Sequence, residues 1–273
     1  MIEVKNLTKS YGSKKAVNDI SFTAEGGQVL GFLGPNGAGK STTMNILTGY
    51  LSSTEGQAFI DGIDILEDPI KAKKLIGYLP EQPPLYFDMT VNEYLDFVYG
   101  LKGCKLPKKS HLDEICEIVK ITDVRKRLIK NLSKGYKQRV GLAQAILGDP
   151  ETIILDEPTA VLTPQETEKL FAILRKMKEQ GCAIIIITHK LQEVLSISDR
   201  VTLLRKGKSV GTVITKETTP QQLTELIVGH AVELKIERPA VENSETMLKI
   251  VDLTVRKSDG GLAINDISFE LNR

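Results

Sequence analysis

Apolar residues along this chain form short uninterrupted runs, and a helical pattern follows each run. Val29–Leu33 (VLGFL), Thr152–Leu155 (TIIL) and Ala183–Ile187 (AIIII) do not alternate apolar with polar positions. Uninterrupted runs of this length are typical of strands that are buried on both faces of a parallel sheet. The pattern therefore predicts an α/β fold with a mainly parallel sheet at its centre.

The segment after the second run has the features of a long amphipathic helix. Thr163 and Glu166 have the spacing of a capping box, and Pro164 occupies the first helical position. Gly181 stands where a C-terminal cap is expected. An apolar stripe at helical spacing predicts the buried face, which consists of Leu170, Ile173, Leu174 and Met177.

Two further regions differ in pattern from the predicted core. Between about residues 83 and 148 the sequence is mostly helical in pattern, which indicates an inserted helical subdomain. Around residues 229–246 the pattern weakens, charged residues accumulate and Pro239 appears. We interpret this second region as a linker.

The chain repeats its own beginning. Met1–Thr8 (MIEVKNLT) matches Met247–Thr254 (MLKIVDLT), and Ala16–Phe22 (AVNDISF) matches Ala263–Phe269 (AINDISF). A β-hairpin that happens to recur is the simpler interpretation. Two aligned blocks favour a second copy of the domain, in which residues 1–228 form the first copy and residues 247–273 begin another.

Composition excludes some classes of function. The 273 residues include 36 basic and 35 acidic side chains, a net charge of +1, so we expect no nucleic-acid partner. Three cysteines (Cys104, Cys116 and Cys182) lack metal-ligand spacing and are interpreted as reduced thiols of a cytosolic protein. No apolar run approaches the ~20 residues that cross a bilayer. Met1 leads directly into strand-like sequence, so we expect no signal peptide.

A glycine-rich stretch between the first run and a helical pattern supplies the strongest chemical signal. Gly34–Ser41 (GPNGAGKS) fits the phosphate-loop pattern G-x-x-x-x-G-K-[ST]. Glycines let consecutive backbone amides face an anion, and the helix that follows adds its positive N-terminal end. The lysine reaches the terminal phosphates and the serine hydroxyl ligates Mg²⁺. We expect ATP to contact Gly34, Pro35, Asn36, Gly37, Ala38, Gly39, Lys40, Ser41 and Thr42.

Three polar residues follow the other two buried runs. Asp156 ends the second run, where a parallel sheet presents ligands, and is expected to hold Mg²⁺. Glu157 is suited to orient or activate an attacking water. His189 follows the third run and is expected to contact the γ-phosphate. Without the phosphate loop, an acidic pair in a turn and a structural histidine would be the better interpretation of these residues.

One more motif distinguishes among phosphate-loop families. Leu132–Leu147 (LSKGYKQRVGLAQAIL) resembles the signature of ATP-binding cassette (ABC) ATPases, usually LSGGQ followed by a helix. Ser133 alone would be interpreted as a helix N-cap. The resemblance implies an ABC-type P-loop NTPase: a mainly parallel core, an antiparallel β subdomain and an inserted helical subdomain.

The same resemblance implies further roles. ATP is expected to lie between two cassettes, with Ser133 and Gly135 of one contacting the nucleotide held by the other. Tyr11 would stack on adenine, and Gln82 would lie near Mg²⁺ and near a membrane permease. Lys134, Tyr136 and Thr163 depart from the usual Gly, Gln and Asp of the family.

The two halves of the chain resemble different subfamilies. Up to about Ala160 the sequence is similar to ATPases of gliding-motility and drug-export systems, and after that point to tandem ATPases of ribose and nucleoside importers. Such a change of resemblance indicates a natural recombinant, a mis-assembled reading frame or an engineered chimera.

We therefore expect the ATP-hydrolysing subunit of an ABC membrane transporter, with ATP and Mg²⁺ as cofactors. Its expected partners are transmembrane permease subunits and a second ABC domain. Its expected location is the cytoplasm, at the inner face of the cell membrane through the permease. The alternatives are a soluble ABC protein acting on ribosomes or DNA, and a non-functional chimeric fragment.

Overall fold

The computed structural model describes residues 1–160, 162–229, 246–257 and 260–272. The chain forms two compact units, Met1–Val232 and Glu233–Arg273. The predicted linker, residues 229–246, falls almost entirely outside the described residues. Each unit is described by itself.

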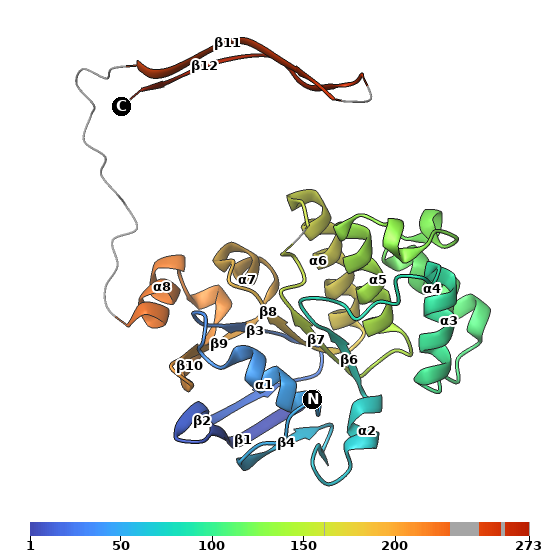
Figure 1. Ribbon diagram of the computed structural model, residues 1–273. Coiled ribbons are helices and arrows are strands. Elements are labelled where there is room, and N and C mark those ends of the chain that lie inside the picture. The colour runs from blue at the N-terminus through green and yellow to red at the C-terminus, as the bar shows by residue number, and fades with distance from the viewer. Residues whose placement is uncertain (161, 230–245, 258–259, 273) are drawn as a thin grey trace. The chain divides into compact units, whose positions relative to one another are not determined.

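A six-stranded sheet forms the centre of the first unit (Figure 1). Its strand order is β10-β9-β3-β8-β7-β6, and every neighbouring pair is parallel except β10 with β9. All three runs that were predicted as buried strands lie here, and every residue of these three strands is buried. The strands are β3 (Val29–Leu33), β6 (Ile76–Leu79), β7 (Thr152–Asp156), β8 (Ala183–Ile187), β9 (Arg200–Arg205) and β10 (Lys208–Ile214).

A second, antiparallel sheet covers one side of this core. Its order is β2-β1-β4-β5, and helix α1 (Lys40–Leu47) lies between the two sheets (Figure 1). Met44 and Leu47 of this helix belong to one buried cluster with Phe22 of the outer sheet and Phe32 of the central sheet. The outer strands are β1 (Ile2–Tyr11), β2 (Lys14–Ala24), β4 (Glu55–Ile60) and β5 (Ile63–Asp64).

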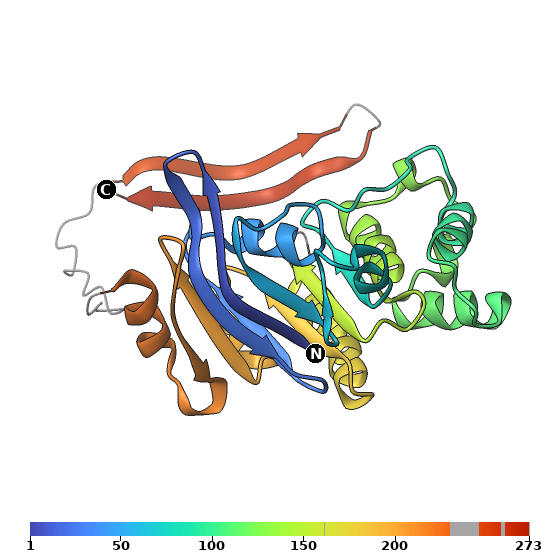
Figure 2. The same ribbon diagram turned by 90° about the horizontal axis from the view of Figure 1, so that it is seen from below.

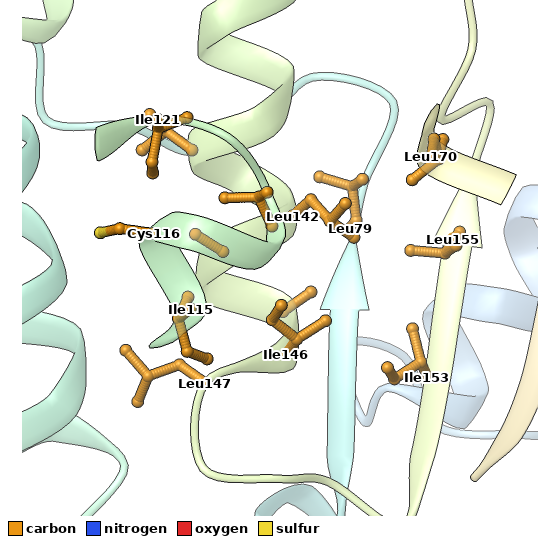
Figure 3. Packing of buried hydrophobic residues seen from close by; sticks show 14 of the residues in the cluster. Leu79, Ile115, Cys116, Ile121, Leu142, Ile146, Leu147, Ile153, Leu155 and Leu170 are labelled. Carbon is orange, nitrogen blue, oxygen red and sulfur yellow. The ribbon is translucent and has the colours of Figure 1, made fainter. Parts of the chain in front are cut away.

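A helical lobe lies beyond the β6 edge of the central sheet (Figures 1 and 2). Figure 3 shows Leu142 and Ile146 of this lobe packed beside Leu79 of β6 and Leu155 of β7. The lobe coincides with the predicted helical region. It contains α3 (Val91–Leu101), α4 (Lys108–Ile118), α5 (Lys134–Ile146) and the 3-10 turns η1 (Thr122–Val124) and η2 (Ile129–Asn131).

The C-terminal end of α5 is bound by two ionisable side chains. The Lys102 ammonium donates to the carbonyl oxygens of Ala145 at 3.1 Å and Leu147 at 2.7 Å. Burial lowers the pKa of Lys102 to about 8. His111 Nε2 accepts from the Gly148 amide at 3.0 Å. These bonds satisfy backbone groups that a helix end would otherwise leave unpaired.

Helix α6 (Pro164–Glu179) confirms the sequence prediction in detail. Thr163 and Glu166 form a complete capping box, and Pro164 occupies the first turn. Gly181 follows the helix with φ of +95°, a conformation that favours glycine. The other helices of the first unit are α2 (Pro69–Lys74), α7 (Leu191–Ile197), α8 (Pro220–Val228) and the 3-10 turn η3 (Thr215–Glu217).

The second unit contains one hairpin, formed by β11 (Thr246–Arg256) and β12 (Leu262–Asn272). Its register repeats that of β1–β2. Six corresponding pairs include Ile2↔Ala24 with Leu248↔Leu271, and Val4↔Phe22 with Ile250↔Phe269.

The irregular backbone of the hairpin is repeated as well. Asp252 and Asp266 have positive φ values of 53° and 50°, as do Asn6 and Asp19 at the corresponding positions, with 49° and 55°. The Asp252 amide donates to the Ser268 hydroxyl at 2.8 Å, as Asn6 donates to Ser21 at 2.9 Å. The sequence repeat is therefore also a structural repeat.

Candidate active site

The strand order of the central sheet brings three functional segments to one edge. Phe32 of β3 and Asp156 of β7 both pair with Ile187 of β8, one on each side. The segments that follow these strands therefore emerge next to one another, at the carboxyl edge of the parallel strands. This edge is where open α/β sheets bind their ligands.

The loop between β3 and α1 is held in one conformation by close backbone contacts. A Cβ on Gly34 would lie 2.3 Å from the Leu204 carbonyl oxygen, and one on Gly39 would lie 2.6 Å from the Ala16 carbonyl oxygen. Gly37 has open space around it and needs glycine for its φ of +77°. The Lys40 ammonium folds back over the loop and donates to the Gly34 carbonyl at 2.6 Å. The loop therefore has the form of a phosphate cradle.

A cleft of about 720 Å³ opens beside this loop. Tyr11 lines the cleft with half of its side chain exposed, and the Lys9 ammonium lies 5.5 Å from the centre of the Tyr11 ring. Six of the predicted ATP contacts line the same cleft: Asn36, Gly37, Gly39, Lys40, Ser41 and Thr42. The structure thus joins an aromatic ring to a phosphate loop in one space large enough for a nucleotide.

Three cationic residues of the cleft were missed by sequence reasoning. Lys14, Lys15 and Lys206 also line it. Lys206 lies in the β9–β10 turn, whose Gly207 amide donates to the Ala38 carbonyl at 3.1 Å. The sequence shows a turn at Lys206–Gly207, but only the sheet order places that turn against the phosphate loop.

Asp156 lies in a strongly negative environment. Burial, together with the charges of Glu157 and Glu81, raises the pKa of Asp156 to about 6, and the Lys40 charge opposes that rise. Burial also lowers the pKa of Lys40, against the charges of Glu157 and Asp156. Three carboxylates and one ammonium therefore share the end of the phosphate loop.

Glu157 and His189 are in direct contact. His189 Nδ1 lies 3.0 Å from Glu157 Oε1, while Glu157 Oε2 is buried and has no hydrogen-bond partner among the described residues. The Glu157 backbone has φ of +47°, which is uncommon for a residue with a side chain, and its amide donates to the Ile187 carbonyl at 2.9 Å. Strain of this kind concentrates at functional sites.

A network around Glu193 ties together the segments that carry Glu157 and His189. The Glu193 carboxylate of α7 accepts from the Thr159 hydroxyl, from the Thr188 hydroxyl at 3.4 Å and from the Lys190 ammonium at 2.9 Å. Lys190 also donates to the Thr159 carbonyl at 3.0 Å. Sequence reasoning missed this network, because no motif shows that α7 packs beside the Thr159 segment.

The remaining predicted residues lie elsewhere. Gln82 is exposed in the loop after β6, and no hydrogen bond joins it to Asp156 within the described residues. Ser133 is the N-cap of α5, as its sequence suggested, and accepts from the Tyr136 amide at 3.3 Å. Neither Ser133 nor Gly135 lines the cleft of its own chain.

The described residues contain neither a cluster of metal-binding side chains nor a helix suited to span a membrane. No group of three or more His, Cys, Asp or Glu side chains could hold a metal ion there. Mg²⁺ in nucleotide sites takes only one or two protein ligands besides phosphate oxygens and water, so Ser41 and Asp156 fit that donor set. None of the described helices combines the length and the apolar character that crossing a bilayer requires.

Comparison with known proteins identifies the family. A family model described as ABC transporter matches residues 17–160. The chain therefore belongs to the ATP-binding cassette family.

Two of its similar relatives are importer subunits. The nucleoside import ATP-binding protein NupA of Lactococcus lactis is 35% identical over 279 residues, covering 99% of this chain. The ribose import ATP-binding protein RbsA of Lacticaseibacillus paracasei is 32% identical over 280 residues and covers the whole chain. The chain spans 55% of the length of each of these relatives.

Solved structures agree with the fold. An ATP-binding subunit of an ABC transporter superposes with a TM-score of 0.77 at 27% identity, over 84% of this chain and 98% of its own. A dimeric cassette in a post-hydrolysis state with ADP and Pi superposes with a TM-score of 0.73 at 25% identity, over 79% and 99%. The predicted fold class, an ABC-type P-loop NTPase, is confirmed.

Proposed function

We propose that this chain binds and hydrolyses ATP as the motor subunit of an ABC membrane transporter. The observation that carries the proposal is the cleft that joins Tyr11 to the Lys40 loop, with the Glu157–His189 pair at the adjoining strand ends. An aromatic face suits a purine base. The loop amides and the α1 N-terminus suit a chain of phosphates.

Glu157 is the group best placed to take a proton from an attacking water. Its Oε1 is held by His189, and its buried Oε2 lacks a partner among the described residues. A buried carboxylate oxygen without a partner is costly and therefore calls for a functional explanation. His189 fixes the orientation of the carboxylate and is 65% exposed, so its other ring nitrogen is accessible to a γ-phosphate.

Lys40, Ser41 and Asp156 would hold the nucleotide and its metal. Lys40 binds loop carbonyls here and is placed to move onto phosphate oxygens, which neutralise its charge better than carbonyls do. Ser41, Asp156 and, by family resemblance, Gln82 would hold Mg²⁺. When bound, Mg²⁺ supplies charge neutralisation across the terminal phosphates.

The complete site would need a second cassette. Ser133 and Gly135 lie away from the cleft of their own chain, which agrees with a role on nucleotide held by another cassette. The register shared by β1–β2 and β11–β12 supports residues 247–273 as the first hairpin of a further cassette.

The remaining proposed partners are the permease subunits of a transporter. We infer that the motor works at the inner face of the cell membrane on permease subunits that import small polar solutes. Relatives named for nucleoside and ribose import match both the cassette and the repeated hairpin, and this match supports import. The change of subfamily near Ala160 stays a prediction.

The test is the molar mass in solution of the Glu157→Gln variant with and without Mg·ATP, measured by light scattering. Without hydrolysis, an ATP sandwich should persist, and the molar mass should double. The matched control is the double variant Glu157→Gln, Lys40→Ala, which should stay monomeric and bind no fluorescent ATP analogue. A Glu157→Gln chain that binds no nucleotide would refute the proposed function.

A further inference from the structure

The middle of α5 and the beginning of α6 are joined by a single carboxylate. Glu166 Oε2 closes the capping box of α6 by accepting from the Thr163 amide at 3.0 Å and hydroxyl at 3.1 Å. Glu166 Oε1 accepts from the Arg139 guanidinium of α5 at 3.0 Å. The two oxygens of one side chain therefore bind two different helices.

Both joined segments carry proposed functional groups. Thr163 follows Glu157 by only six positions along the chain, at the end of the segment that leaves the active site. Arg139 lies about one and two-thirds turns after Ser133, on the helix whose N-cap is Ser133. A Cβ on Gly135 would lie 3.2 Å from Glu166 Oε1, so the carboxylate also lies against the signature segment itself.

The joint is partly shielded from water. The side chains of Arg139 and Glu166 are 19% and 26% exposed. Arg139 is held further by the Lys120 carbonyl at 3.3 Å and by the Tyr136 ring, whose centre lies 5.3 Å away. The Tyr136 hydroxyl donates to Asp123 at 2.9 Å, so the guanidinium is held from several sides. An ion pair of this kind contributes more than an exposed one.

We propose that Arg139 and Glu166 are positioning residues that hold α5 and the start of α6, which follows Glu157 in the chain, in one fixed geometry. The inference rests on the proposed function. Through this pair, the group that a cassette offers to its partner's nucleotide, Ser133, is coupled to the group that acts on its own nucleotide, Glu157.

The chain offers variants that separate the ion pair from the helix cap. Gln serves as well as Glu in the last position of a capping box, so Glu166→Gln keeps the cap and removes the charge. Arg139→Gln removes the charge from the other side and leaves the cap untouched. Asp96→Asn breaks the exposed Lys108–Asp96 pair of the helical lobe, whose side chains are both 49% exposed, and serves as control.

The experiment measures Mg·ATP-dependent association of the full-length chain in the Glu157→Gln background. Each of the two variants should weaken association about tenfold, the low end of what a hydrogen bond between charged groups contributes. The double variant should be no weaker than either single variant, because both lose the same interaction. Affinity for a fluorescent ATP analogue should stay within about twofold, because neither residue lines the cleft.

Several results would overturn the proposal. The first is unchanged association in the single variants. The second is a double variant whose loss of association is the product of the two single losses. The third is a loss of affinity for the ATP analogue as large as the loss of association. If the parent chain binds no nucleotide, the proposed function fails separately; if it binds nucleotide but stays monomeric, association gives no comparison among the variants. Hydrogen exchange of the nucleotide-free chain then decides the inference: exchange of the Tyr136 and Lys137 amides should rise in both variants and not in Asp96→Asn, and unchanged exchange would refute it.

Discussion

Lys102 offers a sharp test of the electrostatics of the helical lobe. Its ammonium caps the end of α5, and burial lowers its pKa to about 8. A lysine of lowered pKa disfavours its charged form in the folded state. Its charge therefore destabilises the folded state fully below pH 8. This destabilisation decreases as the pH rises from about 8 toward 10.5, the pKa of the unfolded chain.

The magnitude follows from the shift. At 1.36 kcal/mol per pKa unit, a lowering from 10.5 to about 8 predicts that the folded state gains about 2 kcal/mol between pH 7 and pH 9.5. The Ala145 and Leu147 carbonyls, at the negative end of α5, favour the charged form and reduce that gain. We therefore expect about 1–2 kcal/mol.

The assay compares wild type with Lys102→Met in urea, followed by far-UV circular dichroism at pH 7, 8, 9 and 9.5. Burial raises the pKa values of Cys116 and Cys182, which lowers the free energy of unfolding at alkaline pH. This effect is the same in wild type and Lys102→Met, so it cancels when the two are subtracted. Between pH 7 and pH 9.5, the free energy of unfolding of wild type should rise by about 1–2 kcal/mol relative to that of Lys102→Met. The exposed Lys105→Met control should show no such trend. A difference that is flat or of opposite sign would refute the reasoning.

Three further predictions concern the active site. Gly34→Ala should abolish folding or nucleotide binding, because its Cβ would lie 2.3 Å from the Leu204 carbonyl oxygen, whereas Gly37→Ala should cost only about 1 kcal/mol of backbone strain; thermal unfolding and nucleotide titration distinguish the two. Tyr11→Ala should weaken ATP binding about tenfold through lost stacking while Tyr11→Phe binds normally, as titration with a fluorescent analogue would show. Asp156→Asn should bind ATP in EDTA as wild type does but gain nothing from added Mg²⁺, and a normal Mg²⁺ enhancement in calorimetry would contradict the role given to Asp156.

Local sequence predicted the parts of the structure that local forces determine. The three uninterrupted apolar runs became fully buried strands, and the Thr163–Glu166 box and Gly181 bounded α6 as expected. Ser133 became the N-cap of α5. Each of these features depends on hydrogen bonds or periodicity within a few residues.

The parts that were missed depend on how distant segments pack. The charge of Glu81 raises the pKa of Asp156, because the β6 edge lies next to β7. Lys206 reaches the phosphate loop only through the β9–β3 pairing. Arg139 meets Glu166 across two helices that are separated by the strand β7 in sequence. No residue pattern along the chain predicts such contacts without the sheet order.

The repeated hairpin has a consequence for assembly during synthesis. Asp252, Asp266 and the Ser268 hydroxyl fix the irregular positions of β11–β12 by contacts inside the hairpin alone. A hairpin forms in about 1–10 μs, whereas a ribosome adds only about 5–20 residues per second. Each hairpin therefore has time to form its own pairing before the residues that follow it are added. A chain that carries this sequence twice sets each pairing independently, and neither copy needs the other as a template.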